Sequence, residues 1–382
     1  MNKKIFYWSP CLNPVGTVKS TLNSAISLIQ YGGNKYDVSL INACGEWDEY
    51  EDVIKSSNIK LINFKFKYFK YLPKTGFIQS RFSYLIIFFI SFFQLLTLLK
   101  KSKPNFLVAH LITSLPLIIM VFNKLDTKFI LRISGLPKLN FFRRNLWALT
   151  SKKIFSVTCP SEELKKRLIS LKLFDHRKLF FLPDAILDIK TYLKFKQNEI
   201  SDKILPKNEK YIVAAGRLTK QKNFSYLILE FEKFLKKNKE YSLLILGEGE
   251  ERNNLELLIK RRNLNSKIFL FGYVKNVYSF FNRAEVFVLS SLWEEVGFVI
   301  VEAAISNLFV ISSNCPNGPK EFLDDEKNGI LFENNKNNAL MDALTRYHKL
   351  DKKKERIIML KKNAKKYTKF RHYLIFEKIL QN

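Results

Sequence analysis

Short apolar runs alternate with longer amphipathic stretches along most of the chain. In the first half, compact apolar runs occupy residues 4–8, 36–42, 106–110, 129–133 and 154–159. In the second half, the corresponding runs lie at 211–215, 242–246, 267–271, 286–289 and 309–312. Helical patterns separate these runs, so both halves predict strands that alternate with helices. This alternation is typical of parallel sheets joined by right-handed crossovers.

Between residues 184 and 206 the sequence has no periodic pattern of apolar residues and is more polar. We therefore predict an inter-domain linker in this segment, with domains at 1–190 and 200–365. Two alternating series joined by a linker predict an α/β protein with two doubly wound, Rossmann-like domains facing across a cleft. Ligands bind such sheets at the carboxyl ends of the strands, so residues that follow the predicted strands are candidates for chemistry.

Residues 82–99 carry no formal charge, and their length approaches that of a membrane-spanning helix. Their four polar residues fall within one third of the helical wheel. Such a stripe favours a helix buried in a domain first, a helix in a membrane interface second, and a spanning helix third. Residues 65–71 alternate basic and aromatic side chains, which fits either anchoring at lipid headgroups or an edge strand guarded by lysines.

Composition adds a strong charge asymmetry to this pattern. The 382 residues include 64 Lys and Arg against 35 Asp and Glu, a net charge of +29. This excess indicates nucleic acid, an acidic membrane surface or phosphorylated substrates as partners, or a nucleotide bias of the source genome. The four cysteines show no zinc or disulfide spacing, which favours a reducing compartment. The N-terminus lacks the long apolar region of a signal peptide and predicts a first strand.

Two cations follow the predicted strand 211–215. Arg217 and Lys222 lie in the segment Gly216-Arg217-Leu218-x-x-x-Lys222-Asn223, just before a predicted helix. A diphosphate leaving group needs its charge neutralised, and fixed cations at a helix start supply that neutralisation. In so basic a chain the alternative is solvated surface charge, but the arrangement favours a binding site.

Two carboxylates, Glu294 and Glu302, flank a glycine turn at Gly297-Phe298. A carboxylate accepts two hydrogen bonds from a sugar diol, and glycine allows close backbone approach. Glu295 is expected on a solvated face. Further turns follow other predicted strands, and these candidates are Gly247 in Gly-Glu-Gly, Gly318 in Asn-Gly-Pro, Gly16 at a helix start and His110 at a strand end. A lone histidine is more often structural than catalytic, and His176, His348 and His372 have no predicted chemistry.

These motifs resemble glycosyltransferase family 4, whose members are retaining enzymes of the GT-B fold. The resemblance covers Gly216 to Asn223, Gly247-Glu248-Gly249, Ser291 to Ala303 and Asn317 to Gly329. It implies that Arg217 and Lys222 hold the donor diphosphate, and that Glu302 binds the ribose with Glu294 near the donor sugar. The remaining positions implied to contact the donor or the reacting sugar are Gly16, Gly216, Gly247, Gly297, Phe298, Gly318 and His110.

The resemblance also implies a metal-independent reaction without a cofactor, because cations replace the metal, and a C-terminal helix at 366–382 that crosses back to the first domain. The motif variants look most like transferases of lipopolysaccharide, capsule and O-antigen assembly. They imply front-face transfer of a hexose or N-acetylhexosamine from a UDP-sugar to a growing glycan, free or lipid-linked. The implied location is the cytoplasm, peripheral on an anionic inner membrane, without nucleic acid. Two alternatives stay open: a non-catalytic basic protein that binds membrane or nucleic acid, and another GT-B enzyme such as a nucleotide-sugar epimerase.

Overall fold

The computed structural model describes residues 2–12, 16–64, 69, 72, 77–198, 205 and 209–382, with side chains omitted for 77–81. The chain divides into two compact units. The first comprises Met1–Ile186 and Lys369–Asn382, and the second comprises Leu187–Thr368. The chain leaves the first unit within the predicted linker segment. Much of the rest of that segment is helix α7 (Ile189–Lys196), whose one buried side chain, Tyr192, explains why its sequence looked like a loop.

The first unit contains a seven-stranded parallel sheet in the described part of the chain, with the order β3-β2-β1-β4-β5-β6-β7. Its strands are β1 (Lys3–Trp8), β2 (Tyr36–Asn42), β3 (Lys60–Asn63), β4 (Phe106–Ala109), β5 (Lys128–Arg132), β6 (Ser156–Cys159) and β7 (Leu179–Phe181). The five strands predicted for this half are confirmed. Two of the observed strands, β3 and β7, were not predicted; both are short, and β3 is only half-buried.

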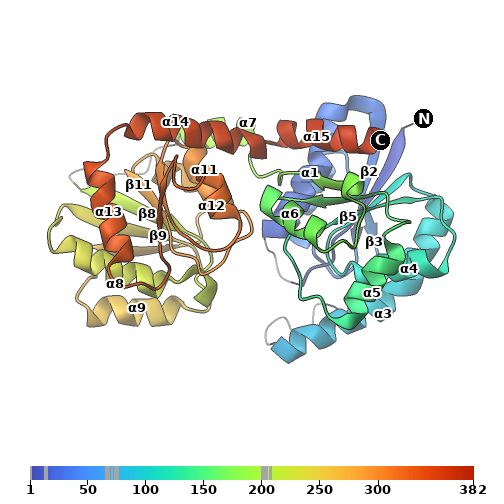
Figure 1. Ribbon diagram of the computed structural model, residues 1–382, viewed down its shortest axis with the longest axis horizontal. Helices are drawn as coiled ribbons and strands as arrows, with labels where there is room; N and C mark the ends of the chain where they lie inside the picture. Colours follow the sequence, from blue (N-terminus) through green and yellow to red (C-terminus); the bar gives the residue numbers. More distant parts are fainter. Residues whose placement is uncertain are drawn as a thin grey trace. The chain divides into compact units, whose positions relative to one another are not determined.

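Helices cover both faces of this sheet (Figure 1). They are α1 (Gly16–Gly32), α2 (Glu51–Ser56), α3 (Phe77–Ser102), α4 (Ser114–Phe122), α5 (Phe141–Thr150), α6 (Glu162–Ser170) and α15 (Lys369–Gln381). Apolar side chains of α3, α4, α5 and α6 pack into one core against the sheet. Those of α1, α2 and α15 pack into a second core. These cores therefore assign the two sets of helices to opposite faces of the sheet, since side chains alternate along each strand.

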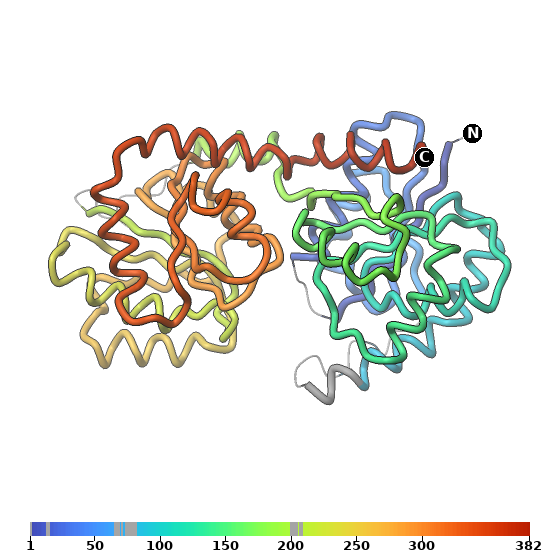
Figure 2. Tube along the Cα trace, in the orientation of Figure 1, coloured from blue at the N-terminus to red at the C-terminus, as the bar shows by residue number. Residues whose placement is uncertain are grey.

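The chain returns to the first unit through α15, which packs beside α1. Figure 2 shows the two ends of the trace close together in this unit. The side chain of Lys3 donates a hydrogen bond to the carbonyl of Leu380 at 3.1 Å. Tyr373 and Phe376 of α15 are buried in the core shared with α1. The last helix is thus an integral layer of a unit whose other residues lie nearly two hundred positions earlier.

The described residues of the second unit form a six-stranded parallel sheet with the order β10-β9-β8-β11-β12-β13. Its strands are β8 (Lys210–Ala215), β9 (Tyr241–Leu246), β10 (Ile268–Gly272), β11 (Val286–Leu289), β12 (Phe309–Ser313) and β13 (Ile330–Phe332). Besides α7, its helices are α8 (Phe224–Leu235), α9 (Arg252–Arg261), α10 (Val277–Phe281), α11 (Phe298–Ile305), α12 (Gly318–Phe322), α13 (Ala339–Lys349) and α14 (Lys353–Ala364). All five predicted strands are present, and the three-residue strand β13 is additional.

Helix α3 has an unusual distribution of side chains. Its buried positions recur every four residues at Ser83, Ile87, Ser91, Leu95 and Leu99. Two of the four polar residues of the predicted stripe therefore face the protein, while large apolar side chains face outward. Among the described residues, one helical segment, Phe82–Ser102, is long and apolar enough to cross a membrane, by length and composition alone. Most of the basic and aromatic segment 65–71 lies outside the described residues.

Candidate functional site

Four neighbouring strands bring the predicted donor-binding residues to one edge of the second sheet. Strands β9, β8, β11 and β12 are consecutive in the sheet and parallel, so their carboxyl ends lie side by side. The loop that follows each strand carries one predicted motif. These loops begin at Gly247 after β9, Gly216 after β8, Ser290 after β11 and Asn314 after β12. Residues separated by up to one hundred positions in the sequence thus converge within this unit.

Two glycines allow these loops to touch. Gly247 has φ +144°, and a Cβ atom at this position would lie 1.9 Å from the carbonyl oxygen of Gly216. A Cβ at Gly318 would lie 2.3 Å from the carbonyl oxygen of Glu295. Neither backbone oxygen can withdraw without moving its loop, so only glycine permits this spacing. The Gly-Glu-Gly turn, a weak signal in the sequence, therefore has a definite steric reason.

Lys222 and Glu294 form an ion pair between the loops after β8 and β11. Lys222 Nζ donates to Glu294 Oε1 at 2.5 Å, and the two side chains are 14% and 10% exposed. The hydroxyl of Ser291 donates to the same carboxylate oxygen at 2.7 Å. The Lys222 side chain also crosses Gly216, where a Cβ would lie 2.9 Å from Lys222 Cε. One cation and one carboxylate are thus held rigidly at the strand edge.

Hydrogen bonds fasten the same two loops to each other. The backbone amide of Leu292 donates to the carbonyl of Gln221 at 2.8 Å, and the Gln221 side chain donates to the carbonyl of Trp293 at 2.8 Å. The hydroxyl of Ser290 donates to the carbonyl of Lys222 at 2.7 Å. The sequence gives no periodic signal for Gln221 or Ser290, because their bonds go to the backbone of a loop about 70 residues away.

The other predicted donor residues differ in exposure. Arg217 is exposed, and its guanidinium has no hydrogen-bonding or ionic partner among the residues that the structure describes. Glu302 is half-buried in α11, where its charge adds to the effect of burial in raising the pKa of Tyr278. Gly297 starts α11 with φ +73°, and Phe298 is its half-buried first residue.

The expectation that Glu295 lies on a solvated face is wrong. Glu295 is half-buried, and its Oε1 accepts a hydrogen bond from the Asn317 side chain at 3.1 Å. Residue Glu294 also forms a parallel bridge with Asn317. The segment from Glu294 to Glu295 is therefore bonded to the loop after β12, and this contact directs both carboxylates into the protein.

His110 follows strand β4 in the first unit and is 7% exposed. The hydroxyl of Thr21 donates its proton to the carbonyl of Thr17, so it accepts from His110 Nδ1 at 2.7 Å. Nε2 then accepts a short hydrogen bond from the hydroxyl of Ser134. Burial, with the nearby charge of Arg132, lowers the pKa of His110 to about 3, so the ring is neutral near pH 7.

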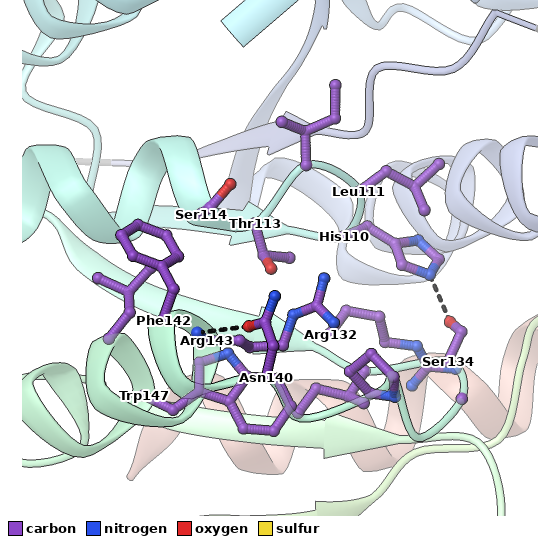
Figure 3. A pocket seen from close by; sticks show the side chains of 15 residues that line it. His110, Leu111, Thr113, Ser114, Arg132, Ser134, Asn140, Phe142, Arg143 and Trp147 are labelled. Carbon is purple, nitrogen blue, oxygen red and sulfur yellow. Dashed lines mark hydrogen bonds between the residues drawn. The ribbon is translucent and has the colours of Figure 1, made fainter. Parts of the chain in front are cut away.

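A cavity of about 360 Å³ opens beside His110 at the carboxyl ends of β4 and β5 (Figure 3). Its polar lining includes Thr113, Ser134 and Asn140, whereas Phe142 and Trp147 supply apolar surface; Arg143 also lines it. Of these side chains only Ser134 directly follows a predicted strand, at 129–133. The Asn140 side chain caps α5 by accepting from the Arg143 amide, a signal that could have located this helix start.

Behind this cavity lies a buried polar network. Arg132 donates to Asp184 Oδ1 at 2.5 Å and to the carbonyl of Leu182 at 2.7 Å. Burial alone would raise the pKa of Asp184, but the charge of Arg132 and the hydrogen bond from Ser20 lower it. His372 of α15 donates from Nδ1 to the carbonyl of Pro183 at 2.6 Å, and its Nε2 accepts from Ser24 at 2.7 Å.

His372 therefore has a structural role that could not be predicted from the sequence. Gly16 is the exposed first residue of α1, and the preceding Val15 lies outside the described residues. Within the part of the chain that the structure describes, no group of three or more His, Cys, Asp or Glu residues could hold a metal ion. The expectation of a metal-independent reaction stays a prediction.

Comparisons with known proteins bear on this arrangement. Residues 195–367 match the family described as Glycosyl transferases group 1. The chain is 30% identical over 260 residues to an uncharacterized glycosyltransferase of Methanocaldococcus jannaschii, with 62% of each chain covered. It is 26% identical over 221 residues to the N-acetylgalactosamine-N,N'-diacetylbacillosaminyl-diphospho-undecaprenol 4-alpha-N-acetylgalactosaminyltransferase of Campylobacter jejuni, covering 57% of this chain and 60% of the relative. The chain thus spans about three fifths of the length of these relatives.

Solved structures match over the full chain. A glycosyltransferase from Rickettsia africae aligns with a TM-score of 0.76 at 17% identity, covering 100% of this chain and 99% of that one. Anabaena HepE, solved in complex with UDP, aligns with a TM-score of 0.72 at 12% identity and covers all of both chains. The fold is therefore that of the GT-B glycosyltransferases, as the motifs predicted. The second unit is similar to the glycosyl transferases group 1 over residues 195–367; membership of glycosyltransferase family 4 stays a prediction.

Proposed function

We propose that this protein transfers a hexose or N-acetylhexosamine from a UDP-sugar to a growing, lipid-linked surface glycan, with retention of anomeric configuration. One observation carries the proposal: the adjacent loops after β8 and β11 bring Lys222 and Glu294 into contact, with the exposed Arg217 in the same loop as Lys222. Two cations beside carboxylates suit a molecule that joins a diphosphate to a sugar. Anabaena HepE in complex with UDP supports the choice of nucleotide.

The proposed reaction proceeds on one face of the sugar. The bond between the anomeric carbon and the diphosphate oxygen breaks, and the acceptor hydroxyl oxygen bonds to the same carbon from the same side. The acceptor proton passes to the departing diphosphate, so no nucleophile from the protein is required. Arg217 and Lys222 stabilise the charge that develops on the leaving group, and this electrostatic term is the main contribution of the protein. Lys222 has three N–H donors, of which Glu294 accepts one.

We assign the remaining donor contacts from the family resemblance. Glu302 accepts hydrogen bonds from the ribose hydroxyls, and Glu294 lies near the donor sugar. Backbone at Gly216, Gly247, Gly297 and Phe298 lines the donor site, and Gly318 keeps the loop after β12 close to it.

The cavity in the first unit is the proposed acceptor site. Its mixed hydroxyl, amide and aromatic lining suits a sugar, whose rings have polar edges and apolar faces. His110, proposed to approach the reacting sugar, is neutral and acts by holding Ser134, which lines the cavity. The name of the Campylobacter jejuni relative supports a glycan attached to a diphospho-undecaprenol carrier as acceptor. Such an acceptor places the protein in the cytoplasm, peripheral on the inner membrane.

The direct test is a screen of nucleotide sugars by thermal shift, followed by product analysis with a labelled form of the best binder. Transfer or slow donor hydrolysis with UDP release is the expected result, without metal and without other cofactors. An epimerised donor would identify a nucleotide-sugar epimerase instead. No UDP-sugar binding, together with salt-dependent binding of DNA, would replace the enzyme by a basic binding protein.

A further inference from the structure

An apolar surface covers the outer side of the helical layer formed by α3, α4 and α5. These helices pack side by side on one face of the first sheet, and their inward residues share one core. Their outward side chains are mostly aromatic or aliphatic and strongly exposed. They are Phe82 (62%), Leu85 (57%), Phe89 (67%) and Phe93 (74%) on α3, Phe122 (78%) on α4, and Phe141 (85%), Phe142 (60%) and Leu149 (68%) on α5. We call these eight residues the outer apolar face.

The outer apolar face differs from the isolated hydrophobic residues that are common on protein surfaces. On α3 its members recur at spacings of three and four residues, so they form a continuous stripe opposite the buried serines. A helix in a soluble domain normally has the reverse polarity, with polar residues outward. Contiguous apolar surface of this kind marks an interaction site.

The charge of the same segment identifies the partner. Residues 77–160 contain one acidic residue, Asp126, and twelve basic residues. The basic residues are Arg81, Lys100, Lys101, Lys103, Lys124, Lys128, Arg132, Lys138, Arg143, Arg144, Lys152 and Lys153. Several are exposed at the edges of the outer apolar face, including Lys100 and Lys101 at the end of α3 and Arg144 on α5. An apolar stripe bordered by cations is the composition of helices that lie in the interface of an anionic bilayer.

We propose that the outer apolar face docks onto the surface of an anionic lipid bilayer. Phenylalanine and leucine side chains would enter the boundary between headgroups and acyl chains, while the flanking lysines and arginines contact anionic headgroups. A protein partner would need a complementary acidic surface and would leave the affinity insensitive to lipid charge.

This docking also specifies how a lipid-linked acceptor reaches the cavity in the first unit, and in that respect it rests on the proposed function. Phe142 and Arg143 at the start of α5 line the cavity, and Phe142 is also part of the outer apolar face. The docked bilayer therefore meets one wall of the cavity. A carrier lipid can stay in the membrane while its glycan enters the cavity, with Arg143 placed to meet the phosphate that joins them.

Vesicle co-sedimentation tests the docking directly. The full chain should bind vesicles containing one third phosphatidylglycerol and bind phosphatidylcholine vesicles far more weakly, with affinity falling as salt rises. The double variant Phe89→Ser/Phe93→Ser should lose at least about tenfold in partition coefficient for each side chain. The variant Lys100→Glu/Arg144→Glu should lose at least about 30-fold. All four positions are exposed, so both variants should fold normally.

Matched controls come from the second unit. Leu257→Ser/Tyr273→Ser removes two apolar side chains that are 51% and 80% exposed, and Lys260→Glu/Arg261→Glu reverses two exposed charges. Neither control should change vesicle binding by more than about twofold. Equal losses in control and test variants, or binding that ignores lipid charge, would overturn the proposal. A concentration-dependent dimer that Phe89→Ser/Phe93→Ser abolishes would assign the face to a second copy instead.

Turnover separates this inference from the proposed function. With a short, water-soluble acceptor and a UDP-sugar, the vesicle-binding variants should keep wild-type turnover, because they leave the loops after β8 and β11 intact. With a long-chain lipid-linked acceptor in vesicles, they should lose activity in parallel with binding. Full vesicle binding without any sugar transfer would refute the function and leave the docking in place.

Discussion

Replacing Lys222 and Arg217 separately should distinguish a cation that supports the fold from one that we propose only binds the donor. The Lys222 side chain is 14% exposed and bonded to Glu294, whereas Arg217 is exposed and has no partner among the described residues. Lys222→Met leaves the Glu294 carboxylate nearly buried, with the Ser291 hydroxyl as its remaining hydrogen-bond donor in this network. We therefore expect a different balance of stability and binding effects in the two variants.

The magnitudes follow from these environments. Removing one partner of a buried ion pair costs about 3–5 kcal/mol, and residual exposure places Lys222→Met near 3 kcal/mol. Arg217→Met should change the free energy of unfolding by less than about 0.5 kcal/mol, as exposed substitutions do. Each variant removes a cation that we propose binds the diphosphate, so each should weaken UDP binding by about tenfold to 100-fold. Turnover should fall by about 10² or more.

The assay combines urea unfolding, calorimetric titration of UDP and turnover at saturating donor. Lys220→Met is the matched control, because Lys220 is an exposed lysine of the same turn, and it should leave all three measurements near wild type. The account of the site fails if Arg217→Met binds UDP as tightly as the wild type. It fails equally if Lys222→Met and Lys220→Met unfold at the same urea concentration, because Glu294 would then not depend on its partner.

Two further predictions concern the backbone contact between loops and the buried histidine of α15. Gly247→Ala places a Cβ against the Gly216 carbonyl, so it should lower stability by about 2 kcal/mol or more and weaken UDP binding. The control Gly33→Ala, at φ +56° with nothing within 4 Å, should cost only the roughly 1–2 kcal/mol of a left-handed residue. Equal effects of the two variants would exclude the steric argument. Burial lowers the pKa of His372 from 6.5 to about 4. Between these pH values the histidine is protonated in the unfolded chain but neutral in the folded chain, so the stability that it contributes is lost as pH falls from about 6.5 to 4. His372→Asn should therefore reduce the loss of unfolding free energy between pH 7 and pH 5 by about 2 kcal/mol. The raised pKa of Glu46, about 7, acts in the opposite direction, but its effect is the same in the wild type and the variant and cancels in the comparison. An unchanged pH dependence in the variant would refute the assignment.

The parallel sheets could be predicted because their central strands are continuous apolar runs. Strands such as β9, with every residue buried, stand out in the sequence. Strands β3 and β13 have three or four residues and lie at the sheet edges, too short for a periodic pattern. Helix α7 buries one side chain, so its polar sequence looked like a linker.

The candidate site shows a similar division. Glycines, cations and carboxylates that follow strands could be found, because the carboxyl ends of parallel strands share one edge of a sheet. Their pairing could not: Lys222 meets Glu294 across 72 residues, and no local pattern encodes that contact. The burial of polar residues in α1 could not be predicted either. The sequence gives no sign that Ser20 and Ser24 are buried, yet both are, and they are bonded to Asp184 and His372.

The return of α15 to the first unit has a consequence for how the protein is made. A ribosome completes the first 186 residues and then synthesises 182 more before the helix that closes that unit emerges. At typical elongation rates this interval lasts about 10–40 s. Throughout it, the apolar side of α1 that later contacts Tyr373 and Phe376 lacks its cover. The second unit, whose residues are contiguous, can complete its own fold earlier. The first unit therefore stays incomplete until α15 has been made, and nascent chains should depend on chaperones until that helix emerges.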